Sequence, residues 1–111
     1  MSLNRLTAPG QLYPGDFLRS NNNAATATFT ADGNFVVTTS KVVWATSTAG
    51  NGGTYITMQV DGSLVIYDSK QKPMWTSGSS GSDREASQLR LTDDGHLQIL
   101  NCGKVIWSVP K

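Results

Sequence analysis

The chain has 111 residues, of which 38% are hydrophobic and 15% charged, and its formal net charge is +1. This length and composition are typical of one globular domain and exclude a disordered chain. The basic residues are scattered and no segment approaches membrane-spanning length, so we expect neither nucleic-acid binding nor membrane insertion. Cys102 is the only cysteine, which excludes an intrachain disulfide.

The N-terminal segment contains turn signals but no apolar run of signal-peptide length. We therefore expect a protein that is cytoplasmic or is released without a recognisable signal peptide. Pro9-Gly10 and Pro14-Gly15 bracket residues 11–13, and this punctuation predicts a short hairpin.

One sequence unit then repeats three times along the chain. Each copy contains an Asp-Gly pair, and a tryptophan follows 12 to 14 residues after the aspartate. The tryptophans are Trp44, Trp75 and Trp107, which are 31 and 32 residues apart. Because the Asp-Gly pair and the tryptophan recur three times at nearly constant spacing, they indicate internal repeats of one supersecondary unit. We assign the repeats to roughly residues 22–47, 54–78 and 87–109 of a single domain, residues 1–111.

Each repeat has the side-chain pattern of β-strands. Residues 28–37, 57–67 and 89–100 alternate between apolar and largely polar side chains with a period of two. The expected core positions are Phe29, Phe35, Val37, Met58, Val60, Leu64, Ile66, Leu89, Leu91, Leu97 and Ile99. The pattern predicts an all-β protein with three small sheets around a pseudo-threefold axis, each wetted on one face. We expect the three tryptophans to share a central core.

Residues 59–67, QVDGSLVIY, resemble the sugar-binding signature Q-x-D-x-N-x-V-x-Y of the monocot (snowdrop or bulb-type) mannose-binding lectins. Four of the five signature positions match, and Ser63 stands where the family has asparagine. Residues 10–18 are similar to that family's first hairpin. The resemblance implies a β-prism II fold of three four-stranded antiparallel sheets, with one potential mannose site per sheet. It also implies a homodimer that exchanges C-terminal strands, and a lectin for mannose or mannose-containing glycans that uses no cofactor.

By this resemblance, five side chains form the main site: Gln59, Asp61, Ser63, Val65 and Tyr67. Asp61 would accept from the axial 2-hydroxyl that distinguishes mannose from glucose, and Ser63 would replace the family's amide donor. Gln59 would reach the 3-hydroxyl, Tyr67 the 4-hydroxyl, and Val65 would pack against the C–H edge of the ring. Since alternate residues of a strand face the same way, we expect this geometry without a special loop.

The other two repeats retain less of the signature. The first keeps Asp32, Asn34 and Val36 but has threonine in place of glutamine and tyrosine, so we expect a weak second site. The third keeps only Asp94, and His96 replaces asparagine, so a structural role is expected there.

Two other readings compete with sugar binding. A polar strand face is often only the solvated face of a sheet, and the alternative function is a non-catalytic interaction or structural prism that has lost sugar binding. His96 and Cys102 would be the base and nucleophile of an enzyme, but no third group orients them, so we expect no enzyme. One histidine and one cysteine also argue against a metal site.

Overall fold

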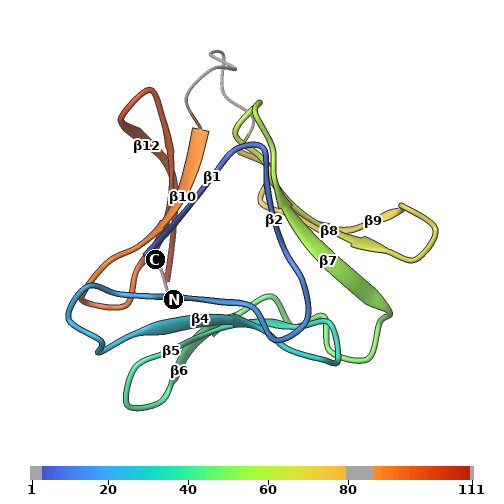
Figure 1. The fold of residues 1–111 in the computed structure, drawn as a ribbon, viewed down its shortest axis with the longest axis horizontal. Coiled ribbons are helices and arrows are strands. Elements are labelled where there is room, and N and C mark those ends of the chain that lie inside the picture. Colours follow the sequence, from blue (N-terminus) through green and yellow to red (C-terminus); the bar gives the residue numbers. More distant parts are fainter. Residues whose placement is uncertain (1–3, 80–86, 111) are drawn as a thin grey trace.

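The computed structural model describes residues 4–79 and 87–110, and these residues form twelve β-strands and no helix (Figure 1). The strands are β1 (Arg5–Thr7), β2 (Gly10–Leu12), β3 (Phe17–Arg19), β4 (Thr26–Phe29), β5 (Phe35–Thr38), β6 (Val42–Ala45), β7 (Gly53–Met58), β8 (Leu64–Asp68), β9 (Pro73–Thr76), β10 (Ser87–Leu91), β11 (Leu97–Asn101) and β12 (Lys104–Val109). The part of the chain described therefore offers no helix of the length and apolar character that a membrane span needs.

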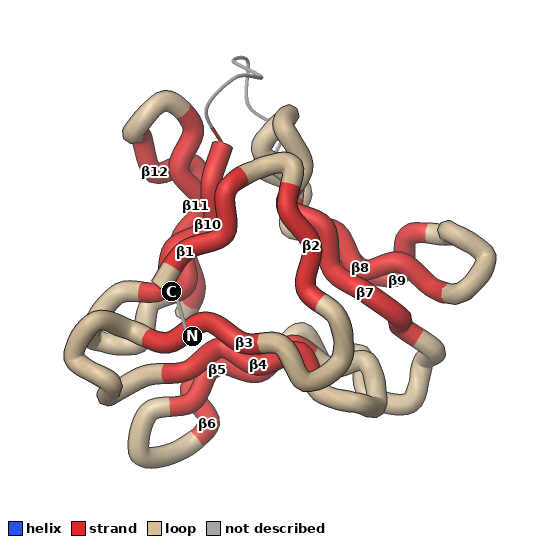
Figure 2. The backbone as a smooth tube through the Cα atoms, viewed as in Figure 1, coloured by secondary structure: helices blue, strands red, loops and turns tan. Residues whose placement is uncertain are grey.

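The strands form three four-stranded antiparallel sheets, which stand as the three walls of a triangular prism (Figure 2). The first sheet has the order β3-β4-β5-β6, the middle sheet β2-β7-β8-β9, and the third sheet β1-β10-β11-β12. Each sheet thus combines three consecutive strands with one strand from the N-terminal arm, residues 5–19. The predicted fold class, an all-β prism of three four-stranded antiparallel sheets, is confirmed.

The N-terminal arm is not a hairpin, and that prediction is wrong. Its strands belong to three different sheets, because β1 pairs with β10, β2 with β7, and β3 with β4. Between β2 and β3 the Asp16 N–H donates to the Tyr13 carbonyl and the Tyr13 N–H donates to the Asp16 carboxylate, both at 2.8 Å. Proline and glycine favour a turn whichever strand comes next, so here they mark the corners of the prism.

The inward faces of the three sheets share one core. Its fully buried apolar side chains include Phe29, Phe35, Val37, Ile56, Met58, Leu64, Ile66, Leu89, Leu91, Leu97 and Ile99. All the core positions expected from alternation are confirmed except Val60, which is 42% exposed. Val60 lies between β7 and β8, where the chain turns and the strand alternation no longer applies.

The three tryptophans contact one another, but they lie at one end of the prism rather than in its centre. Trp44, Trp75 and Trp107 belong to β6, β9 and β12, the last strand of each sheet in pairing order. Their ring centroids are 5.7 to 6.0 Å apart in edge-to-face arrangements. The rings are only half-buried and pack against the core from outside. The three rings therefore form a layer, called here the tryptophan layer, on the edge strands of the three sheets that lie farthest from the strands of the N-terminal arm.

The three Asp-Gly pairs adopt one turn geometry. Gly33, Gly62 and Gly95 have φ values of +89°, +94° and +89°. In each, the glycine N–H donates to the carbonyl three residues earlier at 3.1 Å. This is a type I turn completed by a residue in the left-handed region, where glycine carries no Cβ to clash. Each sheet thus presents an aspartate at the tip of a hairpin.

Candidate functional site

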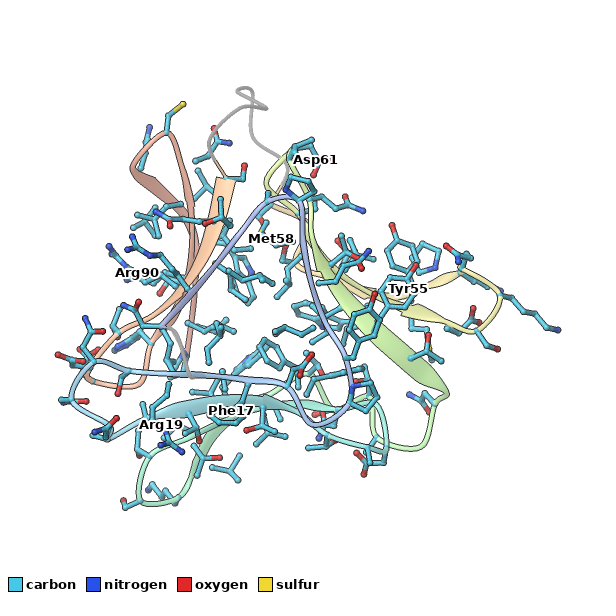
Figure 3. All side chains as sticks on the ribbon, in the orientation of Figure 1. Phe17, Arg19, Tyr55, Met58, Asp61 and Arg90 are labelled. Carbon is cyan, nitrogen blue, oxygen red and sulfur yellow. The ribbon has the colours of Figure 1, made fainter. Side chains whose placement is uncertain are left out.

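The candidate site of the middle sheet spans a turn and a strand. β7 ends at Met58 and β8 begins at Leu64, so Asp61 lies in the turn that joins them. The Gln59 N–H donates to the Ser63 carbonyl at 2.9 Å and closes this turn. Figure 3 shows Asp61 at the tip, away from Met58 on the core side. The expectation that one continuous strand carries the site is wrong, because the position of the aspartate depends on the turn.

The two oxygens of the Asp61 carboxylate have different environments. Oδ1 accepts the Ser63 backbone N–H at 3.0 Å, which ties the side chain to its own turn. Among the described residues, no protein donor reaches Oδ2, and the side chain is partly exposed. An ionised carboxylate only accepts hydrogen bonds. Asp61 is therefore an oriented acceptor with one oxygen free for a hydroxyl from solution.

Gln59 and Tyr67 complete the accessible part of the site. The Gln59 Nε2 donates to the Tyr67 hydroxyl at 2.7 Å, although the two residues are eight positions apart. Their contact spans Val65, which is only 5% exposed, and Ser63 is only 6% exposed. Alternation places both residues on the outer face, yet both are buried. Solvent therefore reaches chiefly the aspartate, the glutamine and the tyrosine.

Two serines that sequence reasoning did not single out support the turn. The Ser77 hydroxyl accepts the Leu64 N–H at 3.0 Å, and the Ser79 hydroxyl donates to the Gly62 carbonyl at 2.8 Å. The two hydroxyls are 2.6 Å apart. The sequence does contain a pattern that could have identified them: in the first and second repeats, residues with a hydroxyl group stand two and four positions after the tryptophan.

The first sheet shows how an asparagine fits the position of Ser63. The Asn34 Oδ1 accepts the Thr46 hydroxyl at 3.0 Å and the Thr48 N–H at 3.3 Å. The Thr48 hydroxyl donates to the Gly33 carbonyl at 2.6 Å, as Ser79 does in the middle sheet. With its oxygen engaged in this way, the amide leaves its NH₂ group for another acceptor.

The remaining positions of the first sheet are less suited to a sugar. Thr30, in place of glutamine, donates its hydroxyl to one oxygen of the Asp32 carboxylate and offers no amide to a sugar. Val36 lies partly exposed on β5, and Thr38 follows it where the middle sheet has a tyrosine. The structure thus brings Asp32, Asn34 and Val36 to one hairpin but gives them no long polar side chains as neighbours.

On the third sheet the signature side chains bind one another. The Thr92 hydroxyl donates to Asp94 Oδ1, and His96 Nδ1 lies 3.1 Å from the same oxygen. The Thr92 hydroxyl first, and then the His96 ring, lower the pKa of Asp94 from 3.8 to about 2. The side chain of Gln98 accepts a hydrogen bond from Arg90 Nη2 at 2.8 Å. The other carboxylate oxygen has no protein donor among the described residues, but Thr92, Gln98 and Leu100 stand here where the signature has glutamine, valine and tyrosine.

The structure does not bring His96 and Cys102 together. They flank the two ends of β11, and six residues of extended chain span roughly 20 Å. Within residues 4–79 and 87–110, no group of three or more His, Cys, Asp or Glu side chains is arranged to hold a metal ion.

A triangular β-prism whose sheets each carry an aspartate at a hairpin tip, beside outward polar side chains, has the architecture of the bulb-type lectins. No family model matches the chain. It is 33% identical over 108 residues to the B-type lectin plumieribetin of Scorpaena plumieri, which covers 97% of this chain and 96% of that protein. The chain therefore belongs to the B-type lectin family, and its structural neighbours include monocot mannose-binding lectins.

Solved structures agree with this assignment. Monomeric monocot mannose-binding lectins from Gastrodia elata are 30% identical, with a TM-score of 0.84 over 95% of this chain and 94% of theirs. The Polygonatum cyrtonema lectin, solved in complex with monomannoside, is 31% identical, with a TM-score of 0.81 over 98% of this chain and 97% of its own. Membership of a lectin family supports carbohydrate binding as the function of this chain.

Proposed function

We propose that this lectin binds mannose or mannose-containing glycans, and that it does so mainly at the middle-sheet site. The observation that carries the proposal is the oriented Asp61 carboxylate, which keeps one oxygen free beside the joined Gln59 and Tyr67 side chains. Strand and turn contacts hold these groups before any ligand arrives, which lowers the ordering cost of binding. The similarity to the mannose-binding lectins of Gastrodia elata and to the Polygonatum cyrtonema lectin, which was solved with a monomannoside, supports the choice of sugar.

Each group has a role that fits its hydrogen-bonding capacity. Asp61 Oδ2 would accept from the axial 2-hydroxyl, which is the group that separates mannose from glucose. Gln59 keeps a carbonyl oxygen and one N–H for the 3-hydroxyl, and Tyr67 keeps its own O–H for the 4-hydroxyl. Val65 forms the apolar floor below them, and Ser63 supplies the turn that orients the carboxylate.

The proposed site is shallow and lacks one amide of the family signature. A monosaccharide in such a site is expected to bind with a Kd of roughly 1 mM, equivalent to about −4 kcal/mol. The first sheet, with Asp32, Asn34 and Val36, would bind more weakly still, because threonine replaces both the glutamine and the tyrosine of the signature there. Useful affinity would then depend on several sites acting together on one glycan surface.

Mannose-agarose retention tests the proposal. The wild-type chain should be retained on the resin and eluted by free methyl α-mannoside. Asp61→Asn should pass through, because a hydrogen bond to a charged acceptor contributes about 1.5–3 kcal/mol, or roughly tenfold to hundredfold in affinity. Asparagine keeps an oxygen for the Ser63 N–H, so this variant preserves the turn better than alanine does.

The matched control is Asp94→Asn, which changes the equivalent carboxylate on the third sheet and should leave retention unchanged. If the wild type is not retained, the mannose proposal fails. The alternative function, an interaction or structural prism that has lost sugar binding, then takes its place. That alternative has its own support on the third sheet, which keeps only the aspartate of the signature and where Thr92 and His96 both contact one oxygen of that aspartate.

The assembly also belongs to the proposal. A homodimer formed by exchange of the C-terminal strand, residues 104–111, stays a prediction of the sequence resemblance. Here β12 pairs with β11 of its own chain, and the similar Gastrodia lectins are monomeric. Native mass measured at micromolar concentration distinguishes a dimer from a monomer.

A further inference from the structure

Three tyrosine rings form a row across the outer face of the middle sheet. Tyr67 on β8 and Tyr55 on β7 are direct cross-strand partners, and their stacked rings are 5.4 Å apart. Tyr13, which follows β2, continues the row at 6.1 Å from Tyr55. Figure 3 shows Tyr55 on the outer side of β7, opposite to Met58. The row begins at the candidate sugar site, because Tyr67 accepts the Gln59 amide there.

Glutamine side chains orient the rings of this tyrosine row. The Tyr13 hydroxyl donates to Gln11 Oε1 at 2.6 Å, and the Tyr55 hydroxyl donates to Gln71 Oε1 at 3.0 Å. Each of these glutamines therefore keeps amide N–H groups for a ligand oxygen. The row and its glutamines carry no charge. Apolar rings bordered by neutral amides match a neutral pyranose, which presents a C–H face and a rim of hydroxyls.

The two other sheets provide an internal comparison. The equivalent cross-strand rows are Arg19–Thr26–Thr38 on the first sheet and Thr7–Gln88–Leu100 on the third. Neither row contains an aromatic ring, so this fold does not require rings at these positions. Aromatic residues occur there only on the sheet that has the most complete sugar-binding signature. Aromatic pairs can stabilise a sheet, but this effect alone does not explain why the rings occur on the same sheet as the most complete signature.

We infer that the tyrosine row is a subsite for the second and later residues of a neutral, mannose-containing oligosaccharide. The inference rests on the proposed function, because the terminal mannose of that glycan would occupy the site of Asp61, Gln59 and Tyr67. Tyr13 is the principal platform, since it is 51% exposed and lies at the end of the row farthest from the mannose. The binding surface of the middle sheet would thus accommodate an oligosaccharide and not only one sugar residue.

Calorimetric titration with two ligands tests this subsite: methyl α-mannoside and an α-linked mannotriose. The wild type should bind the trisaccharide about tenfold more tightly, the gain expected from one added aromatic contact of about 1.4 kcal/mol. Tyr13→Ala should lose this gain and keep its affinity for methyl α-mannoside. Tyr13→Phe should keep most of the gain, because the ring remains.

Arg19→Ala, at the matched position of the first sheet, is the control and should change neither affinity. Equal affinities of the wild type for the two ligands would overturn the subsite while leaving the mannose site in place. An equal weakening of both ligands by Tyr13→Ala would also overturn it, because the tyrosine would then act on the fold or on the first site. If neither ligand binds to the wild type, both the mannose site and the subsite are wrong.

Discussion

Replacement of Trp75 by alanine tests whether the tryptophan layer holds the three sheets together. The Trp75 ring makes two edge-to-face contacts, with Trp44 at 5.8 Å and with Trp107 at 6.0 Å. Aromatic pairs of this kind contribute about 0.5–1.5 kcal/mol each beyond the area that they bury, so the loss of both costs about 1–3 kcal/mol. The half-buried ring also loses contacts with the core. We expect a total loss of about 3 kcal/mol, at the lower end of the range for Trp→Ala because burial is incomplete.

Thermal melting followed by circular dichroism measures this effect. For a domain of this size, 3 kcal/mol lowers Tm by about 12 °C. The control is Val42→Ala on β6, because Val42 is 61% exposed and surface changes of this kind shift Tm by only about 2 °C. If Trp75→Ala melts within a few degrees of the wild type, the tryptophan layer does not stabilise the prism and the reasoning is refuted.

Three further predictions follow from the hairpins and the C-terminal strand. Ser63→Asn should strengthen mannoside binding in calorimetric titrations by several-fold, since Asn34 shows that the pocket accepts an amide and each added hydrogen bond contributes about 0.5–1.5 kcal/mol. No gain would mean that the amide is not the missing contact. The lowered pKa of Asp94 stabilises the folded chain above its unfolded value of 3.8, and this contribution is lost as the pH falls through about 2. Melting temperatures should therefore fall more steeply over that interval for wild type than for Asp94→Asn, and parallel curves would contradict the assignment. Deletion of residues 104–111 should abolish cooperative melting, because it removes β12 and one ring of the tryptophan layer; a normal melt would show that the third sheet needs only three strands.

The sequence predicts the architecture because the core obeys strand alternation. Phe35, Leu64 and Leu97 occupy equivalent inward positions in the three repeats, and a period of two places each of them in the core. Alternation fails where the backbone turns, which is why Val60 is exposed although its neighbours in the pattern are buried. Asp61 lies in the same turn, so its position requires the turn geometry and not only the strand period.

Other features depend on contacts between segments that are distant in sequence. The two Pro-Gly pairs indicate turns, but nothing local tells which sheet the next strand joins. The Ser77 and Ser79 hydroxyls hold a turn about fifteen residues earlier in the chain, a role visible only once β8 and β9 are paired. The tyrosine row likewise needs the register of β7 and β8, because Tyr55 and Tyr67 meet across strands.

The way in which the N-terminal arm supplies one strand to each sheet also makes the three closures differ in sequence separation. The strands of the arm pair in reverse order along the chain: β3 pairs with β4 of the first sheet, β2 with β7 of the middle sheet, and β1 with β10 of the third sheet. The paired residues Phe17 and Thr28 are 11 positions apart, Gln11 and Thr57 are 46 apart, and Leu6 and Leu89 are 83 apart. The entropic cost of closing the longest of these loops exceeds that of the shortest by about 2 kcal/mol. During synthesis the sheets can therefore close one after another, each new repeat pairing with the next strand towards the N-terminus, and the last closure brings β1 and β12 into the same sheet.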